Sequence, residues 1–80
     1  SATDWQTENI GGRLYLISGK TVSGAIVNVL GRETFAGADG SFKIQVNVPT
    51  NDATVEIRDE RGNRTTYVIS LQTSKVLREF

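Results

Sequence analysis

The sequence predicts an all-β fold, a small antiparallel Greek-key β-sandwich of about six to seven strands. Segments 25–30, 42–48 and 53–59 alternate apolar and polar residues, which is typical of strands that bury one face. Glycine or proline closes these segments, and turn signals recur about every ten residues, as in sandwiches and small barrels. No helical apolar stripe separates them, so a parallel fold with crossover helices is disfavoured.

The composition indicates one domain without an affinity for polyanions. Its 80 residues have room for a single core. Nine Lys and Arg balance nine Asp and Glu, and the charges are scattered, so nucleic acid is not expected as a partner. No apolar run approaches the roughly 18 residues of a membrane helix, so no membrane insertion is expected. Cysteine is absent, which excludes a disulfide framework and a thiolate zinc site.

Residues 1–12 are expected to form a linker. They are polar around Trp5, show neither strand alternation nor a helical stripe, and end at Gly11 and Gly12, a flexible joint. No basic region followed by an apolar one opens the chain, which leaves a cytosolic protein or an excised piece of a longer precursor. We favour the excised piece.

The folded domain is expected to span residues 13–71. Its first strand covers Arg13–Ser18, where β-forming residues cluster before Gly19. Because this run is continuously apolar, its buried face is ambiguous, and we expect Leu14 and Leu16 to point inward.

The next strands are expected at Ala25–Leu30 and, after Gly31, at Glu33–Ala36. Asp39-Gly40 then joins the short strand to the following one. Asp-Gly is among the strongest hairpin signals, because a primed turn needs a positive φ that glycine accepts freely. We therefore expect a hairpin here, with Gly40 at positive φ.

The remaining strands are expected at 42–48, which Pro49 ends, at 53–59 and at 64–71. A second glycine turn, Arg61-Gly62-Asn63, joins the last two. Their alternation predicts one shared interior with the second strand. The residues expected in this interior are Val27, Val29, Phe42, Ile44, Val46, Val55, Ile57, Tyr67 and Ile69.

Residues 72–80 are expected to be a linker or the start of a following element. Val76, Leu77 and Phe80 have the spacing with which a helix could begin, but a plain linker accounts for them equally.

The order of these patterns resembles a known family. The matching pieces are Gly24-Ala25 before Val27-x-Val29-x-Gly31, then Ala38-Asp39-Gly40-Ser41-Phe42, then Val55-x-Ile57-x-Asp59-x-x-Gly62-Asn63. Over about Leu14–Leu71 the chain resembles the bacterial immunoglobulin-like domains typified by domain B of glucodextranase. It is also similar, over Gly24–Val48, to the carboxypeptidase regulatory-like (transthyretin-like) domain, which lacks a counterpart of the last piece. Such immunoglobulin-like domains often carry Asn-Gly where this chain has Leu30-Gly31, so the first hairpin could turn differently.

The resemblance implies a β-sandwich that serves as a spacer or accessory module in exported, multidomain bacterial proteins, in the periplasm or at the cell surface. It carries over no catalytic residues.

No catalytic constellation is expected. Histidine and cysteine are absent, which excludes Ser-His and Cys-His nucleophilic machinery. Asp39, Asp52, Asp59 and Glu60 lie at expected turns and are better explained as turn caps than as a glycosidase-like pair, which needs a cleft. The chain is therefore expected to be no enzyme and to hold no cofactor.

Calcium is the strongest metal alternative. Asp52, Asp59, Glu60 and Asn63 carry the oxygen ligands that this ion prefers. However, no Asp-x-Asp spacing is present, and an Asx turn, in which Asp59 accepts hydrogen bonds from the Gly62-Asn63 turn, is favoured. We therefore expect no metal.

Exposed aromatic side chains are the remaining candidates for binding, since sugar rings stack on them. We single out Trp5, Tyr15 and Phe35 as candidate interaction residues and consider Tyr67 as well, whereas Phe42 belongs to the core.

Two function classes follow. The favoured one is a non-catalytic structural or interaction module, a spacer or docking domain, that contacts neighbouring domains or another protein through Trp5 and residues 72–80. The alternative is a ligand-binding module that recognises polysaccharide or a surface protein through a sheet face or an unpaired edge. A patch of coplanar exposed aromatics would favour the alternative.

Overall fold

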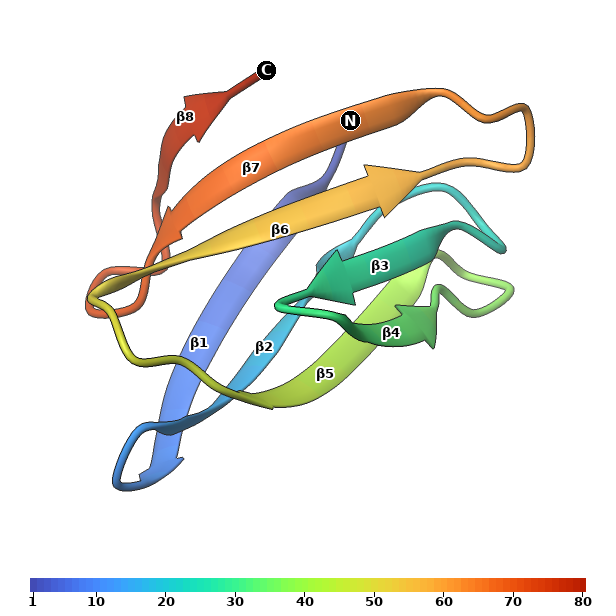
Figure 1. Ribbon diagram of the computed structural model, residues 1–80. Helices are drawn as coiled ribbons and strands as arrows, with labels where there is room; N and C mark the ends of the chain where they lie inside the picture. The colour runs from blue at the N-terminus through green and yellow to red at the C-terminus, as the bar shows by residue number, and fades with distance from the viewer.

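The computed structural model describes residues 1–80 and contains eight strands and no helix (Figure 1). The strands alternate with short turns, as the glycine and proline spacing predicts. Their bounds are β1 Thr3–Gly11, β2 Leu14–Lys20, β3 Ile26–Val29, β4 Arg32–Phe35, β5 Ser41–Asn47, β6 Asp52–Arg58, β7 Arg64–Ser70 and β8 Val76–Glu79.

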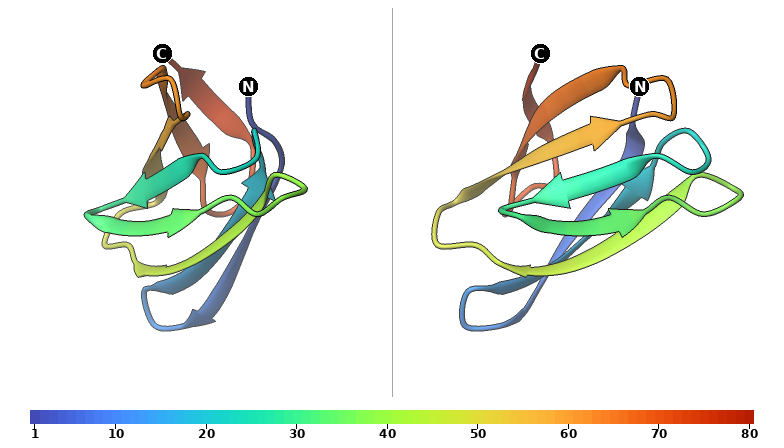
Figure 2. Two further views of the ribbon diagram at one scale, coloured as in Figure 1. Left: turned by 90° about the vertical axis from the view of Figure 1, so that its right-hand side faces the viewer. Right: turned by 45° about the vertical axis from the view of Figure 1, so that its right-hand side comes forward.

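The strands form two packed sheets, which confirms the predicted β-sandwich. One sheet has the order β1-β2-β5 and the other the order β4-β3-β6-β7-β8, and every pair is antiparallel (Figures 1 and 2). The chain changes sheet after β2, β4 and β5. This is the Greek-key order of immunoglobulin-type sandwiches, except that the fourth strand pairs with the third rather than with the fifth.

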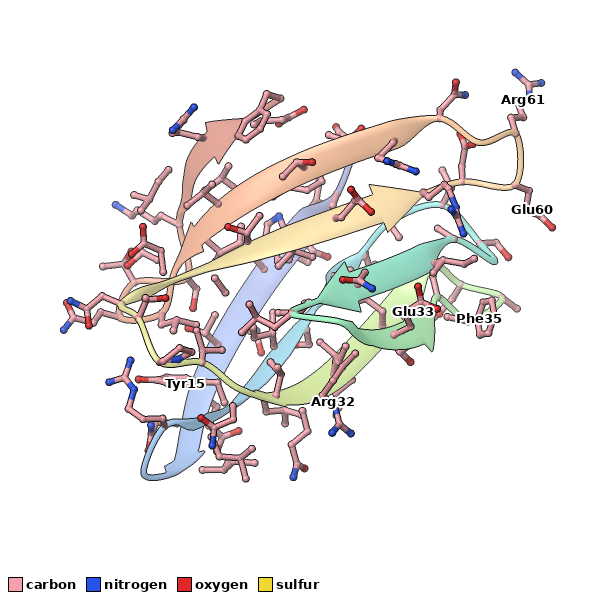
Figure 3. All side chains as sticks on the ribbon, viewed as in Figure 1. Tyr15, Arg32, Glu33, Phe35, Glu60 and Arg61 are labelled. Atoms are coloured by element: carbon pink, nitrogen blue, oxygen red, sulfur yellow. The ribbon has the colours of Figure 1, made fainter.

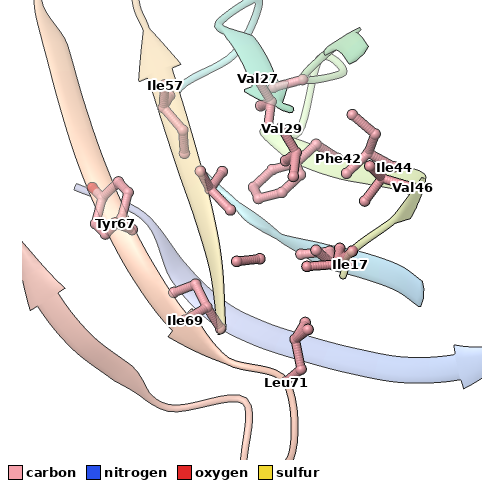
Figure 4. Packing of buried hydrophobic residues seen from close by; sticks show 14 of the residues in the cluster. Ile17, Val27, Val29, Phe42, Ile44, Val46, Ile57, Tyr67, Ile69 and Leu71 are labelled. Atoms are coloured by element: carbon pink, nitrogen blue, oxygen red, sulfur yellow. The ribbon is translucent and has the colours of Figure 1, made fainter. Parts of the chain in front are cut away.

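The core lies between the two sheets, where fifteen buried apolar residues form one cluster (Figure 4). All nine residues expected in the interior belong to it, with exposed fractions of 5% or less. β5 shows the reason most clearly, because its side chains alternate between exposed and buried along the whole strand. Each fully buried apolar side chain of this kind contributes about 1.5–3 kcal/mol to folding.

The inward face of β2 is the opposite of the expected one. Ile17 is fully buried, whereas Leu14 and Leu16 are only half-buried. The register with β5 decides the matter, because it places Ile17 opposite Ile44 and directly opposed residues share a face. The prediction that Leu14 and Leu16 point inward was therefore wrong. The sequence could not decide between the two faces, because the run of apolar residues in β2 is continuous.

The prediction of a linker at residues 1–12 was also wrong, because they contain β1. This edge strand pairs with β2, and its register shifts near both ends. Only Trp5 and Thr7 along it are half-buried, so it lacks the alternation of a central strand. Gly11 and Gly12, at φ 138° and 52°, end β1 and begin the tight turn into β2 rather than forming a flexible joint.

The Asp39-Gly40 turn does not close a hairpin. Its glycine has φ 84°, as expected. However, β4 pairs with β3 and β5 pairs with β2, so this turn carries the chain from one sheet to the other. A turn signal specifies the local backbone but not the strand with which the chain pairs next.

The two-residue hairpin lies instead at Leu30-Gly31, between β3 and β4. Both residues have positive φ, 51° and 84°, which is the requirement of a type I′ turn. The turn is therefore of the kind that Asn-Gly would form, with a leucine in the first left-handed position.

Residues 72–80 contain the edge strand β8 rather than a helix or a linker. β8 pairs with β7, with a register shift opposite Val68 and Ile69. The pairing continues to Phe80, whose N–H donates to Thr66 O at 2.9 Å and whose carbonyl accepts from Thr66 N at 2.7 Å. Together, β1 and β8 raise the number of strands above the expected six to seven.

Candidate functional site

Three loops gather at one end of the sandwich: residues 21–25, 36–40 and 59–63 (right-hand side of Figure 1). Thr21 N donates to Gly40 O at 2.9 Å, which joins the first two loops. The carboxyl group of Glu60 lies beside Gly24, so that a Cβ atom there would be 3.6 Å from Glu60 Cδ. The loops therefore support one another as a preorganised end of the molecule.

Asp59 organises the β6–β7 loop. Its Oδ1 accepts from Arg61 N and from Asn63 N, both at 2.9 Å, and its Oδ2 accepts from Asn63 Nδ2 at 3.0 Å. The side-chain hydrogen bond from Asn63 holds the pKa of Asp59 below its ordinary value, and the backbone N–H groups add to the effect. This geometry confirms the Asx-turn interpretation of Asp59.

Asp39 organises the 36–40 loop in the same way. Its Oδ1 accepts from Ser41 N at 2.9 Å, and its Oδ2 lies 3.0 Å from Ser41 Oγ, which donates to it. The backbone N–H of Ser41 is the main cause of a pKa below the ordinary value, and the Ser41 hydroxyl contributes as well. The carboxylates of Asp39 and Asp59 thus each stabilise the turn in which they lie.

The calcium ligands considered from the sequence do not come together. Asp52 begins β6, whereas Asp59, Glu60 and Asn63 follow its other end. A strand of this length separates them by roughly 20 Å. No group of three or more Asp, Glu, His or Cys side chains lies close enough to hold a metal ion.

Trp5 packs into the sandwich instead of forming an exposed platform. Its ring meets Phe42 edge-on at a centroid distance of 5.5 Å and tilts against Tyr67 at 5.2 Å. Its Nε1 is buried without a hydrogen-bond partner. Tyr67, the further aromatic considered, is itself buried, and its hydroxyl accepts from Ala2 N at 2.8 Å.

Tyr15 and Phe35 lie at opposite ends of the molecule (Figure 3). Tyr15 is half-buried against the core, and the Arg13 guanidinium lies 5.7 Å from its ring centroid. Phe35 is 69% exposed at the end of β4, beside the loop cluster. Trp5, Tyr15 and Phe35 therefore form no common aromatic surface.

Other apolar side chains are exposed besides these three aromatic residues, and among them only those of residues 72–80 were expected to make contacts. Val22, at 52% exposed, lies in the loop cluster near the end where Phe35 is found. In and directly after β8, the side chains of Val76, Leu77 and Phe80 are 41%, 56% and 65% exposed. Strand alternation does not reveal these exposed positions, because Val22 lies in a loop and β8 is an edge strand that pairs on one side only.

The outer face of the three-stranded sheet contains an open hollow of about 340 Å³. Polar side chains dominate its lining, among them Asp4, Gln6, Ser18, Lys20 and Lys43. Small-molecule sites are lined mainly by apolar and aromatic groups, so this hollow does not have the character of such a site.

The strand order and the shared core define this chain as a small antiparallel β-sandwich of two packed sheets. In comparisons with known proteins, no family, no curated protein and no solved structure matches it. It contains no helix with the length and apolar character needed to cross a membrane.

Proposed function

We propose that this chain is a non-catalytic docking module of a larger, exported bacterial multidomain protein, with β8 as the strand through which it contacts a neighbouring domain. The resemblance of residues 14–71 to bacterial immunoglobulin-like domains supports the bacterial and extracytoplasmic parts of the proposal.

The observation that carries the proposal is the exposed apolar surface of the C-terminal segment. Val76, Leu77 and Phe80 are three of the seven large apolar side chains that the chain exposes, and they lie within five residues. Val76 pairs with the inward-facing Ile69 and Phe80 with the outward-facing Thr66, so apolar side chains are exposed on both faces of this edge strand, as expected where a neighbour covers the edge. β8 is also an edge strand, which leaves backbone groups on its outer side without a neighbouring strand.

The positions of the chain ends favour docking over in-line spacing. Ala2 N donates to the Tyr67 hydroxyl, and Phe80 pairs with Thr66, so both end segments lie against β7. In each view of Figures 1 and 2 the two ends leave on the same side. Segments attached there would leave the domain projecting sideways, which suits a module that docks rather than one that lengthens a chain.

Hydrogen exchange tests the proposal. The backbone of Phe80 faces β7, so by alternation the N–H of Glu79 faces the free edge of β8. In the full-length protein this amide should exchange at least tenfold more slowly than in the isolated domain, because the docked neighbour covers it.

Lys43 supplies the matched control. Ser41 O faces away from β2 and accepts from Gly37 N, so the N–H of Lys43 lies on the free edge of β5. Its exchange should be the same in both proteins. Unchanged exchange at Glu79, or equal slowing at both residues, would contradict docking through β8.

A further inference from the structure

The outer face of the five-stranded sheet carries a row of four side chains that crosses four strands. Phe35 of β4 pairs with Ile26 of β3, Ile26 pairs with Arg58 of β6, and Arg58 pairs with Arg64 of β7. Directly paired residues of antiparallel strands project on the same side, so these four form one strip on the sheet surface. We call this strip the Phe35 row, and Figure 3 shows Phe35 at its exposed end beside the loop cluster.

The aromatic end of the row has no aromatic or cationic partner within the chain. Trp5 packs against both Phe42 and Tyr67, Tyr15 lies against Arg13, and Arg78 lies 5.0 Å from the ring centroid of Phe80. Phe35 is the one aromatic ring of the chain without such a contact, and it is also the most exposed large apolar side chain. Its exposure contributes nothing to folding.

The cationic end of the row is electrostatically unfavourable. Arg58 and Arg64 are directly opposed across β6 and β7, and like charges in this position destabilise a sheet. Glu56 forms the single ion pair of the chain, with Arg64 at 3.7 Å. The neighbouring Glu33 is engaged by Asn28 Nδ2 at 3.3 Å, so Arg58 has no carboxylate partner.

We propose that the Phe35 row is a docking surface for a segment of a partner protein that carries an acidic side chain next to an apolar one. This inference rests on the proposed role as an interaction module and gives the chemistry of a partner at a second surface. The apolar side chain packs on Phe35 and Ile26, and the carboxylate accepts hydrogen bonds from the Arg58 guanidinium.

The spacing of the row specifies the partner further. Neighbouring strands lie about 4.8 Å apart, so Phe35 and Arg58 are separated by about 10 Å. Alternate side chains of an extended segment lie about 7 Å apart. The long side chain of Arg58 can bridge the difference of about 3 Å between this spacing and its distance from Phe35. A Leu or Ile two residues away from a Glu or Asp therefore fits.

A peptide titration tests the proposal. The probe is the acetylated and amidated peptide Ser-Leu-Ser-Glu-Ser-Leu-Ser-Glu, and the control peptide has Lys in place of each Glu. Both are added to the ¹⁵N-labelled chain up to several millimolar. We expect the acidic peptide to shift the amides of Phe35, Ile26 and Arg58 in a saturable way, and the basic peptide to leave them in place.

Matched variants locate the site. Arg58→Glu and Phe35→Ser should each weaken binding of the acidic peptide at least tenfold. Lys43→Glu changes the net charge by the same amount as Arg58→Glu but lies on the outer face of the other sheet. Ile10→Ser removes another exposed large apolar side chain, near the end of β1. Both controls should bind the peptide as the original chain does.

Several results would overturn the proposal. These are the absence of a saturable shift, equal shifts with the basic peptide, shifts centred on other residues, or equal weakening by the control variants. Self-association that Arg58→Glu abolishes in sedimentation would identify the occupant as a second copy and would also overturn it. Because the peptide probes the row and the exchange experiment probes β8, the two experiments report the failure of each hypothesis separately.

Discussion

At the scale of single residues, Gly40 occupies the least replaceable position of the chain. It is buried at φ 84°, and a Cβ atom there would be 2.0 Å from Thr21 O, a backbone atom. Gly62 has nearly the same backbone, φ 89°, but open space around it. The two glycines therefore separate the effect of a left-handed backbone from that of a close approach.

We expect Gly62→Ala to lower the free energy of unfolding by about 1–2 kcal/mol, the cost of placing an L-residue in the left-handed region. Gly40→Ala should lower it by about 2–5 kcal/mol, because overpacking against the Thr21 backbone adds to that strain. Urea denaturation of both variants measures the difference. Equal losses would show that the Thr21 contact contributes nothing.

Leu30, unlike these glycines, is an L-residue with a side chain in a left-handed backbone conformation. It is 58% exposed at φ 51°, in a turn that prefers asparagine or glycine. Leu30→Asn should therefore raise the free energy of unfolding by about 1 kcal/mol. Thermal melting of the variant measures this change, and a lower melting temperature would contradict the strain argument.

Asp59 makes folding stability depend on pH in a defined direction. Hydrogen bonds lower its pKa in the folded chain below the ordinary value of 3.8. Its contribution is therefore present in full above that value and is lost as the pH falls through the folded pKa. The urea midpoint should decline as the pH falls below about 4, and Asp59→Asn should flatten part of this decline.

Asp52 provides the comparison for this experiment, because its carboxylate accepts no hydrogen bond. Asp52→Asn should leave the acid-dependent decline in place. A decline that Asp59→Asn leaves unaltered would show that the Asn63 and Arg61 contacts do not favour the charged carboxylate.

At the scale of elements, β1 closes one side of the sandwich. Thr7 N donates to Ser74 Oγ at 2.9 Å, and Thr7 Oγ1 donates to Leu71 O at 2.9 Å, which ties β1 to the segment after β7. Trp5, which also belongs to β1, packs against Phe42 and Tyr67. β1 is thus a structural element whose removal exposes the core.

We expect Trp5→Ala to lower the free energy of unfolding by about 3 kcal/mol, toward the lower end of the range for large-to-small substitutions, because the ring is half-buried. Chemical denaturation followed by circular dichroism measures the loss. Gln6→Ala, at the exposed position next to it, should change stability by less than about 0.5 kcal/mol. A comparably small effect of Trp5→Ala would restore the linker interpretation of residues 1–12.

At the scale of the whole molecule, the end segments lie together against β7. A circular permutant that joins Phe80 to Ser1 through about ten Gly and Ser residues, which span roughly 17 Å, should therefore fold. New ends between Arg61 and Gly62 lie at an exposed loop tip. Its amide chemical shifts away from both junctions should match those of the original chain, and a collapsed spectrum would show that the ends are too far apart.

Local sequence patterns are sufficient to predict the fold class, the inward faces of β3, β5, β6 and β7 and the Asp59 turn. Each of these depends on residues close together in the chain: alternation at neighbouring positions, or a carboxylate that reaches backbone groups two and four residues away. Phe35 was one of several aromatic residues considered for a binding surface, and its exposure distinguishes it from the buried Tyr67.

The tertiary structure decided the inward face of β2, the roles of β1 and β8 and the arrangement of the Phe35 row. These depend on contacts between residues far apart in the sequence, such as the pairing of Ile17 with Ile44 and the bond from Thr7 to Ser74, which are 67 positions apart. Arg58 and Arg64 become neighbours of Phe35 only through the order of the strands in the sheet. Local patterns specify which residues are apolar, but strand pairing decides which of them are covered, and an edge strand that is covered on one side leaves no alternating pattern.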